Sequence, residues 1–439
     1  MLTYERSETG RQYPLRVLMW ESTLRCNAFC EFCGSSCNAQ AASDELSSAE
    51  IRGLFQRIAE RYDASDIMIN VTGGEPLLRR DLFDVMEYAH SRGYRWGIVT
   101  NGSLLTDANI EGLRRSCVST ISVSIDGMGE LHDQIRRFPG CFDRIVEGLQ
   151  KLKRLDTLEH CMVTTIVSRH NYDQLEPLKH FLCSLPIDIW RIGTVDPIGR
   201  AHENDVLLLD PEQMQGVLSF IRRSRQEALP YRVTTSCSHY LGEYELTARD
   251  APFQCFSGKQ LAGIPANGDI FVCPNVPRRP ELIQGNIRTD DFIKVWENGF
   301  QYFRDLESRK KNRCETCSHF PVCAGDSLHT WDFDRDAPRI CFLDYGMKPQ
   351  NFPHSEFWEK SFDEIIDICR TGRENCRCLR VKAQSLSKDR VILSAQAAAA
   401  VFSFFGWGDK RSEPATEQIA AYTGPAANYT ELLMILPTE

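Results

Sequence analysis

The sequence predicts an α/β fold built on a parallel sheet. From residue 16 to about residue 227, short apolar runs alternate with stretches whose apolar residues recur every three or four positions. Turn-forming residues separate these segments, so strands and helices follow one another in series. Six such β/α units imply right-handed crossovers between parallel strands. Eight units would complete a (β/α)8 barrel, and this chain has fewer.

The strands are predicted from bulky apolar runs that end in polar or glycine residues. In chain order they are Arg16–Trp20, Asp66–Val71, Trp96–Thr100, Val118–Ile125, Cys161–Val167 and Ile187–Thr194. The helices are predicted from apolar residues that share one face, such as Ile51, Leu54, Phe55 and Ile58 in the first. They are expected over 47–62, 80–91, 106–115, 140–155, 171–184 and 211–227.

Three cysteines directly follow the first predicted strand. Cys26, Cys30 and Cys33 have the spacing C-x3-C-x2-C. Three thiolates are one fewer than an ordinary 4Fe–4S cluster uses, so one iron is left open, as in a catalytic metal site. A zinc site or a redox pair is the alternative, because a C-x2-C pair is typical of those as well.

A second motif follows the second predicted strand. Thr72 leads into Gly73-Gly74-Glu75-Pro76. Residues without Cβ permit close backbone approach to a ligand, and the Glu75 carboxylate suits an ammonium group. The alternative is an ordinary strand-to-helix turn, with glycines for the bend and Pro76 opening the helix.

Together these two motifs resemble the radical S-adenosylmethionine (radical SAM) superfamily. The resemblance implies a partial (β/α)6 TIM-like barrel in which the three cysteines hold a 4Fe–4S cluster. It also implies that the open iron binds the methionyl group of S-adenosylmethionine. Reductive cleavage then yields a 5′-deoxyadenosyl radical, which abstracts hydrogen from the substrate.

The same resemblance assigns further cofactor-binding residues. Gly73, Gly74, Glu75 and Pro76 would bind S-adenosylmethionine. Ser124 and Arg136 (or Arg137) would hold the methionyl carboxylate, for which a guanidinium is well suited. Phe32 would pack near the adenine, and the backbone at Val195 would contact it. Ser124 as a plain strand residue and solvated arginines are the alternatives, and no catalytic acid or base is identified.

A second group of cysteines begins at residue 255. Cys255 and Cys273 flank Asn267-Gly268, a strong hairpin signal. Cys314, Cys317, Cys323 and Cys341 follow. Those four thiols would also suit a structural zinc ribbon.

The arrangement resembles the SPASM domain, the auxiliary-cluster extension of radical SAM enzymes. The resemblance implies that Cys314, Cys317, Cys323 and Cys341 hold one auxiliary iron–sulfur cluster. It also implies a second cluster at Cys255 and Cys273, but the further cysteine expected there is replaced by Ser327. Asp326 is the predicted substitute ligand, with His329, Ser327 and Cys237 as alternatives. One or two auxiliary clusters are therefore expected.

Composition narrows the class of protein. The chain has 439 residues with a net charge of −9, which argues against nucleic acid as the main partner. No signal peptide or membrane span is apparent, and 18 cysteines suggest a reducing, cytoplasmic location. The expected domains are a radical SAM barrel (14–230), a SPASM domain (231–345) and a C-terminal extension of unknown role (346–439).

The resemblance implies a peptide or protein substrate and an electron donor such as flavodoxin or ferredoxin. Few residues precede the first strand, so a leader peptide is expected to need a separate carrier or the C-terminal region. Pro274 stands where sulfatase-maturing relatives usually have an aspartate, which argues against that branch. The alternatives are a small metabolite or cofactor precursor as substrate, or a zinc-binding interaction protein without radical chemistry.

Overall fold

The computed structural model describes residues 13–40, 44–153, 155–202, 204–249, 253, 255–349, 378–382 and 431–435. Residues 14–241 and 253–347 form one compact unit, and the other described residues belong to a second. The domain boundaries drawn from the sequence stay a prediction. Most of the expected C-terminal extension lies outside the described residues.

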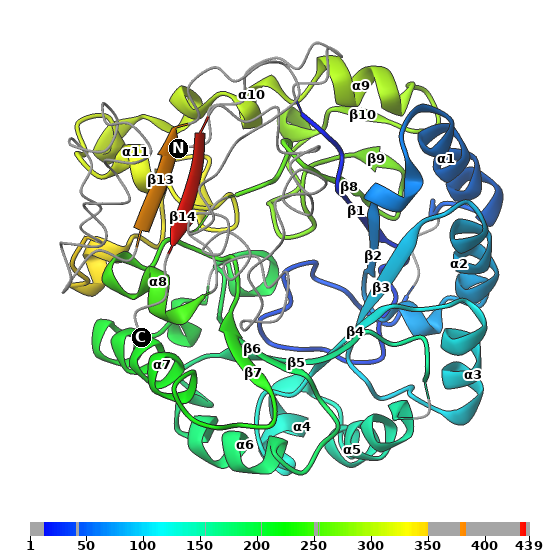
Figure 1. The fold of residues 1–439 in the computed structure, drawn as a ribbon, viewed down its shortest axis with the longest axis horizontal. Coiled ribbons are helices and arrows are strands. Elements are labelled where there is room, and N and C mark those ends of the chain that lie inside the picture. Colours follow the sequence, from blue (N-terminus) through cyan, green and yellow to red (C-terminus); the bar gives the residue numbers. More distant parts are fainter. Residues whose placement is uncertain are drawn as a thin grey trace, which may run out of the picture. The chain divides into compact units, whose positions relative to one another are not determined.

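An eight-stranded sheet forms the centre of the larger unit (Figure 1). Its order is β7-β6-β5-β4-β3-β2-β1-β8, and every neighbouring pair is parallel. The six predicted strands are confirmed, and two more flank them. The bounds are β1 Val17–Glu21, β2 Met68–Thr72, β3 Arg95–Thr100, β4 Thr120–Ser124, β5 His160–Val167, β6 Ile189–Thr194, β7 Arg232–Thr235 and β8 Leu261–Ile264.

Helices cover the outer face of the strands β1–β7 (Figure 1). The six predicted helices are present, and the short helix α4 was not predicted. The bounds are α1 Ser48–Arg61, α2 Leu82–Ser91, α3 Asp107–Arg115, α4 Glu130–Arg136, α5 Cys141–Leu152, α6 Leu175–Leu182 and α7 Pro211–Ser224. Capping boxes at Ser47 and Asp210 fix the starts of α1 and α7, because each side chain satisfies a free backbone N–H.

The segment after β8 is built from short elements. The predicted hairpin is confirmed: the backbones of Gly263 and Phe271 exchange two hydrogen bonds of 2.8 and 2.9 Å. Gly268 turns the chain at φ +87°, a conformation that favours glycine. The bounds are β9 Asp269–Ile270, β10 Gly285–Asn286, α9 Phe292–Asn298, α10 Gln301–Arg304, α11 Phe320–Cys323, β11 Trp331–Asp332 and β12 Ala337–Pro338.

Among its described residues, the second unit contains α8 (Glu245–Ala248) and the antiparallel pair of β13 (Cys378–Lys382) with β14 (Glu431–Ile435). Across the described part of the chain, no helix combines the length and apolar character needed to cross a membrane.

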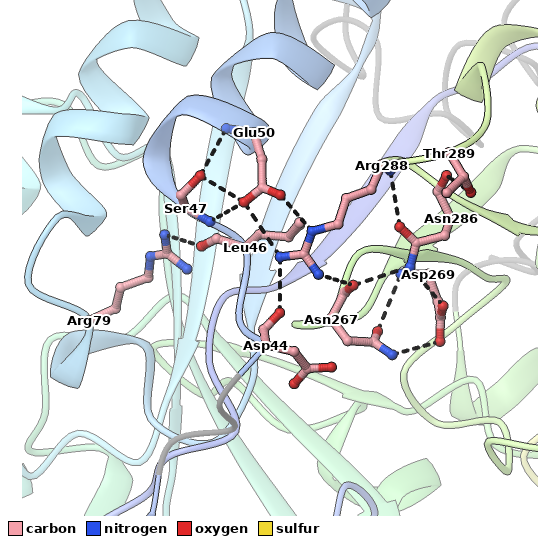
Figure 2. A network of polar contacts seen from close by, with 10 residues as sticks. All are labelled: Asp44, Leu46, Ser47, Glu50, Arg79, Asn267, Asp269, Asn286, Arg288 and Thr289. Atoms are coloured by element: carbon pink, nitrogen blue, oxygen red, sulfur yellow. Dashed lines mark hydrogen bonds and ion pairs between the residues drawn. The ribbon is translucent and has the colours of Figure 1, made fainter.

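A polar network joins the start of α1 to the hairpin region (Figure 2). The Arg288 guanidinium pairs with the Glu50 carboxylate at 2.5 Å and donates to the carbonyls of Asp44 and Asn267. The hydrogen bonds from Arg288 and Ser47 lower the pKa of Glu50 to about 2. The network therefore fastens the later segment to the barrel by contacts that depend on an ionised carboxylate.

Candidate active site

The loop after β1 carries Cys26, Cys30 and Cys33, and a neighbouring arginine holds its backbone. Arg200, which follows β6, donates from its guanidinium to the carbonyls of Cys30 and Cys37, each at 2.7 Å. Its backbone N–H donates to the carbonyl of Cys33 at 3.0 Å. No contact of Arg200 was predicted from the sequence, because an isolated arginine after a strand has no distinguishing pattern.

The three thiols of this loop lie close enough to influence one another electrostatically. Burial raises the pKa of Cys26 to about 11, and its neighbours Glu75, Cys30 and Cys33 add to the effect. Burial also raises the pKa of Cys30, against the opposing charge of Arg136. The thiol of Cys37 donates a hydrogen bond that lowers the pKa of Cys33 to about 5.

These groups fit an iron–sulfur cluster, which binds thiolates and displaces their protons. Within the described ranges, no three His, Cys, Asp or Glu side chains are placed to hold a single metal ion. A cluster makes a different demand, because each cysteine binds its own iron.

The Gly-Gly-Glu-Pro segment packs against the cysteine loop through its backbone. The N–H of Gly74 donates to the carbonyl of Thr23 at 2.7 Å, and that of Glu75 to the carbonyl of Arg25 at 2.9 Å. A Cβ on Gly73 would lie 2.2 Å from the Thr23 oxygen, and one on Gly74 would lie 2.2 Å from the Arg25 oxygen. The missing side chains therefore serve contact between two protein segments.

The carboxylate of Glu75 is fully buried and accepts three hydrogen bonds. Oε1 accepts from the Thr100 hydroxyl at 2.8 Å and the Leu77 N–H at 3.1 Å, and Oε2 from the Asn101 N–H at 2.8 Å. Burial outweighs these bonds and raises its pKa. An ammonium ligand beside the carboxylate would offset the energetic cost of burying its negative charge. Pro76 opens the 3-10 turn Pro76–Leu78, as the turn interpretation predicted.

The predicted carboxylate-binding arginine already has protein partners. Arg136, at the end of α4, pairs with Asp126 at 2.5 Å and donates to the Cys30 sulfur at 3.4 Å. Arg137 follows in the left-handed conformation with its guanidinium over Phe29. Ser124 is the last residue of β4, half-buried, in register with Thr164.

The two residues predicted to contact adenine share one apolar cluster. Phe32 packs against the buried group Val195, Ala201 and Leu207, and the Arg136 guanidinium lies 5.5 Å from its ring. The structure therefore joins the cysteine loop, the end of β6 and Arg136 around one site, although these segments are far apart in sequence.

Four cysteines from the segment after residue 300 line a cavity of about 410 Å³. Its walls include Cys314, Cys317, Cys323 and Cys341. Burial raises the pKa of Cys314 to about 11 and of Cys323 to about 12. Four thiols around one cavity fit a complete auxiliary cluster. Asp326 lines this same cavity.

A separate group of residues surrounds Cys273. Its sulfur lies 3.5 Å from Nε2 of His329, whose Nδ1 lies 3.4 Å from the Asp196 carboxylate. Cys237 is near enough to Cys255, Cys273 and His329 for their charges to act on its thiol. Burial opposes ionisation of Cys255, but the charges of Arg309 and His329 and two backbone N–H groups lower its pKa overall.

The fold and the two cysteine arrangements define an enzyme of the iron–sulfur, S-adenosylmethionine-dependent class, and comparisons with known proteins agree. Residues 20–182 match the radical SAM superfamily, and residues 255–319 match the SPASM iron–sulfur cluster-binding domain. The chain is a radical SAM enzyme with a SPASM domain. The cofactors of this class are 4Fe–4S clusters and S-adenosylmethionine.

Individual relatives support this assignment. The AdoMet-dependent heme synthase of Methanosarcina barkeri is 29% identical over 71% of this chain and 90% of its own. The PqqA peptide cyclase of Rhizobium meliloti is 26% identical over 73% of this chain and 84% of its own. The structure of Streptococcus suis SuiB bound to S-adenosylmethionine has the same fold, with a TM-score of 0.57 and 15% identity over 71% of this chain and 73% of SuiB.

Proposed function

We propose that this enzyme abstracts hydrogen from a peptide or protein and thereby installs a post-translational modification. The supporting observation is that a three-cysteine loop and a four-cysteine cavity occur in one compact unit. The PqqA peptide cyclase, to which most of this chain is similar, has a peptide substrate by name.

Several of the predicted residues have a specific task in this proposal. Cys26, Cys30 and Cys33 hold the first cluster, and with S-adenosylmethionine bound this site supplies a 5′-deoxyadenosyl radical. Glu75, buried beside the loop, receives the methionyl ammonium. Phe32 and Val195 provide an apolar surface for adenine.

Arg136 has a more restricted role than the sequence suggested. It is committed to Asp126 and Cys30, so a methionyl carboxylate must share its guanidinium, which has five N–H donors. Its hydrogen bond to Cys30 places a positive charge beside one ligand of the first cluster. Ser124 stays a predicted contact of the same carboxylate.

The electron that starts the reaction has to come from outside the chain. We propose a small redox protein such as flavodoxin or ferredoxin as donor.

A cofactor precursor is the second candidate substrate. It is favoured by the similarity to the AdoMet-dependent heme synthase over nine tenths of that protein. The third interpretation, a zinc-binding interaction protein, does not agree with the two family matches.

The test is co-expression of the enzyme with short peptides encoded beside its gene, followed by anaerobic isolation and mass spectrometry. A mass change in one peptide that requires Cys26, Cys30 and Cys33 (the first-loop cysteines) supports the proposal. In parallel, purified enzyme is incubated with S-adenosylmethionine, dithionite and decarboxylatable tetrapyrroles. Turnover of a tetrapyrrole with every peptide unchanged would replace the peptide proposal with the cofactor-precursor one.

A further inference from the structure

The Cys255/Cys273 site lacks the cysteine that its domain pattern expects at position 327. The residue found there, Ser327, is buried and already engaged. Its hydroxyl donates to the carbonyl of Ser238 and accepts from the N–H of His329 at 3.2 Å. Ser327 therefore helps to hold the two segments that carry Cys237 and His329.

Asp326, the substitute ligand predicted from the sequence, is directed elsewhere. Its Oδ1 accepts the N–H of Tyr240 at 2.8 Å and the N–H of Ser327 at 3.0 Å. It also lines the cavity of the other four cysteines. Asp326 and Ser327 therefore both hold the backbone of residues 238–240, which directly follow Cys237.

His329 is placed as a metal ligand. Its ring is buried, with Nε2 3.5 Å from the Cys273 sulfur and Nδ1 3.4 Å from the Asp196 carboxylate. Histidines that bind metals commonly have their second ring nitrogen oriented by a carboxylate. The Asp196 carboxylate lies beside Nδ1 here, and Nε2 faces the Cys273 sulfur.

The charges around Cys255 suit an anionic cluster. Arg309 and Lys259 are both buried, and both interact electrostatically with Cys255. Buried cations are costly without an anionic partner, because water no longer solvates them. A cluster with several thiolates supplies that partner.

We propose that His329 and Cys237 complete the second auxiliary site. An iron–sulfur cluster there is bound by the thiolates of Cys237, Cys255 and Cys273 and by Nε2 of His329. An imidazole ligand raises the reduction potential above that of an all-thiolate cluster. The inference rests on the SPASM assignment and is independent of the substrate.

The experiment uses full-length, anaerobically reconstituted protein in which the three first-loop cysteines are alanine, so that only auxiliary clusters contribute. Pulsed EPR of the reduced protein should show nitrogen-14 coupling to one cluster. His329→Cys should retain the iron, lose that coupling and lower the midpoint potential of this cluster. Cys237→Ser should lose iron from the same cluster. His180→Cys, the same change at an exposed position on α6, should alter none of these.

Two results would overturn the inference. One is nitrogen coupling and iron content that are unchanged in His329→Ala. The other is loss of this cluster from Asp326→Asn while Cys237→Ser and His329→Ala keep it, which would assign the ligand to Asp326. Because no readout depends on turnover, failure here is distinguishable from failure of the proposed function.

Discussion

The contact between Gly74 and the cysteine loop gives a sharp test of the site. In Gly74→Ala the new Cβ would lie 2.2 Å from the carbonyl oxygen of Arg25 and 2.6 Å from its carbon. These are backbone atoms, so no flexible side chain can move aside. The loop has to shift, and this weakens the hydrogen bonds from Gly74 to Thr23 and from Glu75 to Arg25.

The expected cost is about 3–5 kcal/mol, from about 1–3 kcal/mol for overpacking and about 1 kcal/mol for each hydrogen bond. For a unit of this size that corresponds to a fall in Tm of about 4–7 °C. The displaced loop should also hold less iron after reconstitution. Calorimetry and iron analysis measure the two effects.

Gly53→Ala is the matched control. A Cβ at this position on α1 would meet only the end of the Arg57 side chain, at 3.4 Å. Because alanine is a better helix former than glycine, the change should stabilise the protein by up to about 1 kcal/mol. If Gly74→Ala has wild-type Tm and iron content but binds S-adenosylmethionine weakly, the glycine serves the ligand and our reasoning is refuted.

Three further predictions concern the clusters and the polar network. Alanine at all three first-loop cysteines should abolish cleavage of S-adenosylmethionine to methionine and 5′-deoxyadenosine, measured by chromatography; undiminished cleavage would contradict the assignment. Cys317→Ser should lose about four irons per chain and destabilise the surrounding region, because ligation contributes folding energy; zinc at this site in strictly anaerobic protein would overturn the auxiliary cluster. Arg288→Ala should cost about 1 kcal/mol in urea unfolding at pH 7. Because the folded-state pKa of Glu50 is depressed, that difference is present above pH 5 and should shrink as the pH falls towards 2; a constant difference would show that the ion pair contributes nothing.

Most of the barrel was predictable because its signals are local. The six strands follow apolar runs, and α1 begins directly after Ser47 because a capping box can form at this N-cap. The hairpin at Asn267-Gly268 depends on turn chemistry within a few residues. The helix α4 was missed because seven residues are too few for a periodic pattern.

Long-range pairing and side-chain partners were not predictable. Nothing near Leu261–Ile264 indicates that this segment pairs with β1. The sequence identified Arg136 but not its commitment to Asp126, because that contact depends on where α4 directs its last turn. Arg200 was missed for the same reason: its hydrogen bonds go to backbone carbonyls, which leave no trace in the residue types.

The position of β8 has a consequence for the order in which the protein is made. β1 pairs with β2 soon after synthesis, but its other edge stays open until residues 261–264 have left the ribosome and paired with residues 17–20. Until then the nascent chain carries an unpaired strand edge next to Cys26, Cys30 and Cys33, and such edges promote association with other chains. We therefore expect iron to be loaded at Cys26, Cys30 and Cys33 after the SPASM region has left the ribosome rather than before it.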